Sequence, residues 1–86
     1  MEAIIPYPAN QFTIRYRCDD PRGRTALIVE DNAGAAYLFT GGHLQGRLRG
    51  TNASARLARR LASNAEWQPI PRVTPYTLDG LRQITG

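Results

Sequence analysis

The chain has 86 residues, of which 42% are hydrophobic, and a formal net charge of +4 at pH 7. A chain of this length forms one small domain, and its ordinary apolar content excludes an intrinsically disordered protein. The single cysteine excludes an internal disulfide, and the sequence shows neither a signal-peptide pattern nor an apolar run long enough to cross a membrane. We therefore expect a single cytoplasmic domain over residues 1–86, with a thin core.

The positive charge is concentrated between residues 32 and 65. This segment contains five arginines and no acid, whereas residues 1–31 contain four arginines and five acids, and residues 66–86 contain two of each. All eleven basic residues of the chain are arginines. The guanidinium group suits phosphates and carboxylates, but a coding bias towards arginine and alanine would give the same composition. The position of the arginines is therefore more informative than their number.

Three strands are predicted in the first half of the chain. Residues 11–18 alternate, and their apolar positions are Phe12, Ile14, Tyr16 and Cys18. This period of two is typical of a strand with one buried and one exposed face. Residues 24–30 are apolar on both faces at their centre, which favours a strand covered on both sides, and residues 35–40 form the third strand. The turns at 19–23 and 31–34 are short, so the strands should form an antiparallel meander.

Two further segments flank this meander. Ile4-Ile5, which precedes Pro6, is a candidate for a short N-terminal edge strand. After the third strand, Gly41-Gly42 should end the sheet, and residues 43–50 should form a glycine-rich connection. This loop matches neither the P-loop nor the dinucleotide-binding fingerprint, because the required residues and the parallel strand–helix context are missing. Its glycines would serve to reverse the chain between sheet and helix.

An amphipathic helix is predicted from Ala53 to about Asn64, with Thr51 or Asn52 as its N-cap. Its inner face consists of small and aliphatic residues, namely Ala53, Leu57, Ala58, Leu61 and Ala65. Its outer face carries the three arginines Arg56, Arg59 and Arg60. Because the alanines are small, the helix should lie close to the sheet.

The C-terminal segment has a different character. Pro69, Pro71 and Pro75 favour an extended arm along a sheet edge, where missing N–H groups cost little. Thr77 is a typical N-cap for a short terminal helix, with Asp79 in its first turn. The inner side of this helix would be formed by Leu78, Leu81 and Ile84.

Together these elements predict an α+β fold. It consists of a three-stranded antiparallel meander, one amphipathic helix packed on one face, a proline-rich extended arm and a short C-terminal helix. One helix can cover only one face of the sheet. The other face must be covered by the C-terminal segment, through Trp67, Ile70 and Tyr76, or by a second copy of the chain.

The strongest functional candidates are the five arginines of the basic segment, namely Arg47, Arg49, Arg56, Arg59 and Arg60. No acid lies near them in sequence, and the free N–H groups at the start of the helix would add partial positive charge. Such a surface could hold successive phosphates of DNA or RNA, with binding that weakens as salt rises. The helix lacks the Asn or Gln pattern of base reading, so the contacts would be with the backbone. The alternative is a solvated face whose charges pair with acids elsewhere in the fold.

The other chemically versatile residues favour structural roles. The aromatic residues of the strands are Tyr16, Tyr37 and Phe39, which are more typical of a core than of a base-stacking surface. The only histidine, His43, and the only cysteine, Cys18, belong to no catalytic arrangement. Asp19-Asp20 suits a turn better than a metal site. We expect no enzyme activity, cofactor, metal or small-molecule ligand, and the inner face of the helix is too small for membrane binding.

The favoured interpretation is a non-catalytic protein that binds a nucleic-acid backbone through the basic loop and helix. The alternative is a protein-interaction or assembly module, either a homodimer or a subunit of a larger complex. Its contact surface would be the second sheet face and the arm, and the candidate interface residues are Ile28, Trp67, Ile70 and Tyr76.

Overall fold

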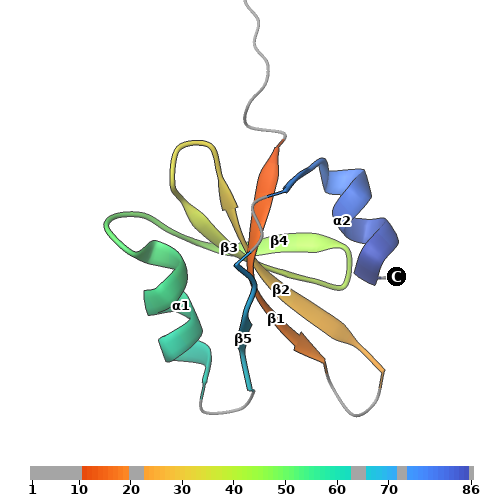
Figure 1. Cartoon of the computed structure of the whole chain (residues 1–86), viewed down its shortest axis with the longest axis horizontal. Helices are drawn as coiled ribbons and strands as arrows, with labels where there is room; N and C mark the ends of the chain where they lie inside the picture. Colours follow the sequence, from red (N-terminus) through yellow and green to blue (C-terminus); the bar gives the residue numbers. More distant parts are fainter. Residues whose placement is uncertain (1–10, 20–22, 63–65, 72–73, 86) are drawn as a thin grey trace, which may run out of the picture.

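The structure, a computed structural model, describes residues 11–19, 23–62, 66–71 and 74–85. It has an α+β fold in which two helices lie on opposite sides of a central antiparallel sheet (Figure 1). In chain order the elements are β1 (Phe12–Asp19), β2 (Thr25–Asp31), β3 (Ala36–Thr40), β4 (His43–Leu48), α1 (Ala53–Leu61), β5 (Gln68–Pro69), β6 (Pro75–Tyr76) and α2 (Leu78–Thr85). The predicted α+β class is confirmed, whereas the predicted strand count of three is wrong, because the sheet contains six strands within these residues.

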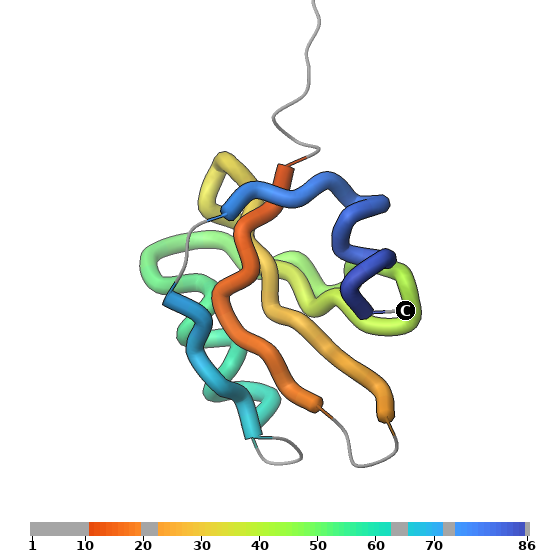
Figure 2. The backbone as a smooth tube through the Cα atoms, turned by 45° about the vertical axis from the view of Figure 1, so that its right-hand side comes forward, coloured from red at the N-terminus to blue at the C-terminus, as the bar shows by residue number. Residues whose placement is uncertain are grey.

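The sheet has the order β4-β3-β2-β1-β5, and β6 also pairs with β1. Both short strands lie along the edge of β1 that faces away from β2, as Figure 2 shows. Pro69 is opposite Tyr16, and the backbone N–H of Ile70 donates to the carbonyl oxygen of Arg15 at 2.8 Å. The predicted extended arm along a sheet edge is therefore confirmed. The candidate strand at Ile4-Ile5 lies outside the described residues.

The strand β4 corrects the prediction that the sheet ends at Gly41-Gly42. These two glycines have φ angles of 62° and 82°, which is the backbone that a two-residue hairpin turn requires. The chain therefore turns back, and His43–Leu48 pairs antiparallel with β3. The register shifts beside Gly46, whose φ of 60° is typical of a glycine in a β-bulge. The glycines that suggested a loop are the residues that allow a hairpin.

A second bulge, in β1, corrects the prediction that one face of this strand is buried. The pairing with β2 shifts between Ile14 and Tyr16, which leaves Arg15 as an extra residue. Phe12 and Ile14 pack on the α2 side of the sheet, whereas Tyr16 packs on the α1 side, opposite Ile28. Alternation of residue types continues unchanged through the bulge, because the extra residue, Arg15, is an exposed polar residue between two apolar ones. The alternation in the sequence therefore gives no sign that β1 changes from one side of the sheet to the other.

Each face of the sheet carries its own apolar cluster. On the α2 side the buried residues are Phe12, Ile14, Leu27, Val29, Phe39 and Leu81, with Tyr37, Leu44, Ile70, Tyr76 and Leu78 partly buried against them. On the α1 side they are Ile28, Ala36, Ala53, Leu57 and Ala58, with Tyr16, Leu48, Leu61 and Trp67 partly buried. The expectation that the C-terminal segment covers the second face is confirmed for Ile70 and Tyr76. It is wrong for Trp67, which packs on the same side as α1 because the arm begins there.

The two helices begin differently. In α2, the hydroxyl of Thr77 accepts the backbone N–H of Gly80 at 3.1 Å, as predicted for an N-cap. In α1, Asn52 occupies the N-cap position in a left-handed conformation and makes no side-chain cap hydrogen bond. The inner face predicted for α1 is confirmed at Ala53, Leu57 and Ala58, which are buried, whereas Ala65 lies outside the described residues. The prediction for Ile84 is wrong, because its side chain is 40% exposed at the end of α2.

Candidate functional site

The arginines of α1 border two adjoining hollows. The first, which we call the helix hollow, has a volume of about 280 Å³ and is lined by Leu48, Arg56, Arg59 and Arg60. The second, which we call the edge hollow, has a volume of about 320 Å³ and lies between α1 and β4. It is lined by Leu38, Gln45, Gly46, Arg47, Leu48, Leu57, Arg60 and Leu61. Arg60 and Leu48 line both hollows, so Arg60 is the charged group that joins them.

Arg56 is fixed to the loop that precedes its own helix. Its Nη2 donates to the carbonyl oxygen of Arg49 at 2.6 Å, and its Nε donates to the carbonyl oxygen of Thr51 at 3.1 Å. These bonds to a charged donor hold the loop between β4 and α1 against the helix. The position of Arg56 on an exposed helix face gave no sign of this role in the sequence. The backbone that carries Arg49 is therefore held in place by a member of the predicted site.

Arg47 has a neighbour that the arginines of α1 do not share, namely Tyr37. Its guanidinium group lowers the pKa of the Tyr37 hydroxyl. The ring of Tyr37 packs with the cluster on the α2 side. This hydroxyl donates to Oδ2 of Asp31 at 3.0 Å. Burial raises the pKa of Tyr37 above 10.0, the hydrogen bond to Asp31 raises this pKa further, and Arg47 opposes both. The fold thus brings Arg47 beside Tyr37 and Asp31, while Arg47 also lines the edge hollow with Arg60.

Glu30 lies beside the start of α1. The hydroxyl of Ser54, which is buried, donates to Oε2 of Glu30 at 2.8 Å. The same carboxylate has Arg15 Nη1 at 3.9 Å from its Oε1. A carboxylate at this position offsets the partial positive charge of the helix N-terminus. The N–H groups at the helix start have no side-chain cap, as expected, but the nearby Glu30 carboxylate would reduce their contribution to a positive surface.

Among the residues that the structure describes, none of the five candidate arginines forms an ion pair with a carboxylate. The ion pairs in these residues belong to other arginines and join Arg15 to Glu30, Arg17 to Asp19 and Arg82 to Asp79. Arg49, Arg56, Arg59 and Arg60 are all exposed. Three of them, on α1, therefore form a positive surface around the helix hollow that the described acids leave uncompensated.

Asp19 accepts hydrogen bonds from side chains of β1 and β2. The hydroxyl of Thr25 donates to its Oδ1 at 2.9 Å, and Arg17 Nε lies 3.2 Å from the same oxygen. The hydrogen bond from Thr25 and then the one from Arg17 lower the pKa of Asp19. Asp20 lies outside the described residues. Within the described ranges, no group of three or more His, Cys, Asp or Glu side chains could hold a metal ion.

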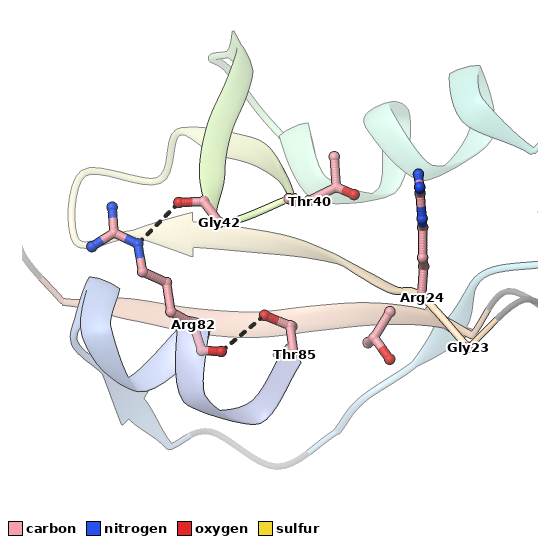
Figure 3. Close-up of a pocket in the computed structure, with 8 residues that line it drawn as sticks. Gly23, Arg24, Thr40, Gly42, Arg82 and Thr85 are labelled. Atoms are coloured by element: carbon pink, nitrogen blue, oxygen red, sulfur yellow. Dashed lines mark hydrogen bonds between the residues drawn. The ribbon is translucent and has the colours of Figure 1, made fainter.

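A third pocket lies where α2 meets the turn between β3 and β4. Figure 3 shows Arg24 and Arg82 at opposite ends of this pocket. Arg82 Nε donates to the carbonyl oxygen of Gly42 at 3.0 Å, and its Nη1 donates to Asp79 at 3.1 Å. The two guanidinium groups therefore do not converge on one ligand. At this pocket, the hydrogen bond from Arg82 to Gly42 links α2 to the hairpin turn.

The candidate interface residues are largely covered by their own chain. Ile28 is completely buried beneath α1, and Ile70 and Tyr76 are half-buried against the cluster on the α2 side. Trp67 is half-buried, and its Nε1 has no hydrogen-bond partner among the described residues. Of the other residues considered from the sequence, Phe39 is buried and His43 is exposed at the start of β4. The structure thus leaves little of the second sheet face accessible.

Neither helix in the described part of the chain is long and apolar enough to span a lipid bilayer. Comparison of the chain with protein-family models, with curated proteins and with solved structures finds no match. The argument for a function consequently depends on the geometry of the surfaces themselves.

Proposed function

We propose that this chain is a non-catalytic protein that binds the phosphate backbone of a nucleic acid on the outer side of α1. The observation that carries the proposal is the helix hollow, where Arg56, Arg59 and Arg60 gather without a carboxylate partner among the described residues. Guanidinium groups bind phosphates through paired N–H donors, and each phosphate contact releases condensed counterions. Arginines grouped around one hollow suit neighbouring phosphates of one strand.

The arginines would have unequal roles. The side chains of Arg59 and Arg60 make no hydrogen bond to other described residues, so they would contact phosphates directly. Arg56, which holds the preceding loop, would keep Arg49 beside them. Arg47 would contribute little, because it acts on Tyr37 towards the other side of the sheet. The outer side of α1 offers no amide side chain for reading bases, so we expect contacts with the backbone.

The proposal is tested by fluorescence anisotropy with a labelled 20-base-pair DNA duplex and a single-stranded RNA of equal length. Arg59→Glu should lower the affinity for the duplex by about tenfold at low salt and should reduce the dependence of binding on salt concentration. Arg24→Glu is the matched control, because it makes the same change of charge at an exposed arginine that does not line the hollow. Comparing DNA with RNA shows which nucleic acid binds more tightly.

Two results would contradict the proposal. One is the absence of any binding at low salt. The other is an equal loss of affinity in Arg59→Glu and Arg24→Glu, because binding would then reflect net charge alone. Thermal unfolding of both variants checks that the fold is retained.

The rival function, a protein-interaction module that uses the second sheet face, has less support. That face is covered by α2 and the arm, and Ile28 is inaccessible. We propose the cytoplasm as the compartment, because the single Cys18 offers no structural disulfide.

A further inference from the structure

The two edges of the sheet differ in their cover. The outer edge of β1 is occupied by β5 and β6. The outer edge of β4 pairs with no strand in the described part of the chain, since β4 is the terminal strand of the sheet order. A strand at a sheet edge presents unpaired N–H and C=O groups that can pair with another extended segment. His43–Leu48 therefore offers a six-residue template for an additional strand.

The edge hollow lies directly beside this template. Four leucines contribute to its lining, namely Leu38, Leu48, Leu57 and Leu61, and its charged groups are Arg47 and Arg60. Its volume of about 320 Å³ is sufficient for a bulky aliphatic side chain. Pockets of this kind next to an edge strand select side chains at alternate positions of an added strand. The hollow thus favours a segment with an aliphatic residue flanked by negative charge.

Positive charge is available on both sides of the edge. Arg60, from α1, and Arg47, from β4, both line the edge hollow, and Arg47 also lowers the pKa of Tyr37, whose ring packs on the α2 side. Successive side chains of an added strand point to alternate sides of the sheet. Acidic residues at neighbouring positions would therefore meet an arginine on either side. A second copy of β4 would instead bring another strand with an arginine and no acid to the same positive edge, and like charges on an edge oppose pairing.

We propose that β4 binds an extended, acidic polypeptide segment as an additional strand, with one aliphatic side chain in the edge hollow and carboxylates beside Arg47 and Arg60. This interaction goes beyond nucleic-acid binding. It uses Arg47, which does not line the helix hollow, and it does not use Arg59, which lines the helix hollow alone.

The test uses the full chain and a fluorescein-labelled peptide of sequence Glu-Asp-Leu-Glu-Ile-Glu-Asp-Thr. We expect saturable binding by fluorescence anisotropy at low salt. The same peptide with N-methyl groups on alternate backbone nitrogens keeps its charge but loses N–H donors, and it should bind at least tenfold more weakly. Equal binding of both peptides would overturn the proposal, because the attraction would then be electrostatic alone.

A matched pair of variants separates this proposal from nucleic-acid binding. Arg47→Gln should weaken peptide binding about fivefold and leave duplex affinity within twofold, whereas Arg59→Gln should do the reverse. If Arg59→Gln weakens both ligands and Arg47→Gln neither, the helix hollow is the only binding surface and the strand proposal is wrong. If neither variant affects the duplex but Arg47→Gln weakens the peptide, nucleic-acid binding fails and strand addition stands.

Hydrogen exchange provides a readout that does not depend on the variants folding. Peptide binding to the unaltered chain should slow exchange of backbone amides in His43–Leu48 more than in β1. Absence of protection in β4 would overturn the proposal. Sedimentation at high protein concentration tests the competing occupant, and a dimer that protects the same amides without peptide would assign the edge to a second copy.

Discussion

The two sides of the sheet differ in the size of the side chains that are buried there. On the α2 side, large residues such as Phe39 and Leu81 are completely buried, and Phe12 and Tyr37 meet edge to face with ring centres 6.0 Å apart. On the α1 side, three of the five buried residues of the cluster are alanines, and the other two are Ile28 and Leu57. Burial of large apolar side chains provides most of the stabilisation, whereas small residues allow a helix to lie close to a sheet. The α2 side therefore mainly holds the fold together, and the α1 side mainly presents charge.

The largest effects should come from removing matched leucines on the two sides. Leu81→Ala should lower the free energy of unfolding by about 3 to 4 kcal/mol, and Leu57→Ala by about 2 to 3 kcal/mol. Leu81 is completely buried among large neighbours, which cannot close the resulting cavity easily, whereas Leu57 is 5% exposed. Urea unfolding measures both values. A greater loss in Leu57→Ala would reverse the comparison.

A smaller loss of stability is expected from removing the hydrogen bond between Ser54 of α1 and Glu30 of β2. Ser54→Ala removes the hydroxyl that donates to Glu30 and should lower the free energy of unfolding by about 1 to 1.5 kcal/mol. Thr51→Ala is the control, since this side chain is exposed, and its effect should stay within about 0.5 kcal/mol. Equal effects in urea unfolding would mean that the bond to Glu30 does not stabilise α1.

On the α2 side, Tyr37 links stability to pH. The pKa of Tyr37 is raised above 10.0 in the folded chain, so the folded state favours the protonated hydroxyl. This contribution is fully present below pH 10 and is lost as the pH rises through the folded-state pKa. Tyr37→Phe should cost about 1 kcal/mol at pH 7 through the lost bond to Asp31. Urea unfolding between pH 7 and 11 should show a shallower decline for the variant, and identical slopes would exclude this linkage.

The smallest effect distinguishes two arginines of the charged side. Arg56→Met keeps the aliphatic stem but removes the donors to the carbonyl groups of Arg49 and Thr51, and it should cost about 0.5 to 1 kcal/mol. Arg59→Met, its neighbour on the same face, should change the free energy of unfolding by less than about 0.5 kcal/mol. Thermal unfolding compares the two. If both variants are equally stable, the bonds of Arg56 hold the loop without stabilising the fold.

The elements with local signals were predictable from the sequence. The alternation of residues 11–18 and the apolar centre of Leu27-Ile28-Val29 identified strands, and the small inner face of α1 identified its orientation. Thr77 identified the start of α2 because its capping bond is made within one turn. In each of these cases the residues that determine the structure are neighbours in sequence.

The errors arose where distant contacts decide the outcome. Gly41-Gly42 is compatible with a loop or a hairpin, and only the pairing of β4 with β3 distinguishes them. In the candidate site, the sequence identified the exposed arginines of α1. It could not show that Arg47 acts on Tyr37 or that Glu30, from β2, lies at the start of α1. A segment without acids in its own sequence can therefore lie beside an acid from another strand of the fold.

The bulge at Arg15 has a consequence for how the molecule opens. Because β1 changes sides there, Ile14 and Tyr16 are separated by a single residue of one strand yet pack in the two opposite clusters. Loss of pairing in β1 would disrupt both layers together, so neither helix can detach its half of the interior independently. Such a chain should melt in one cooperative step, and the slowest-exchanging amides of both helices should report the same opening event.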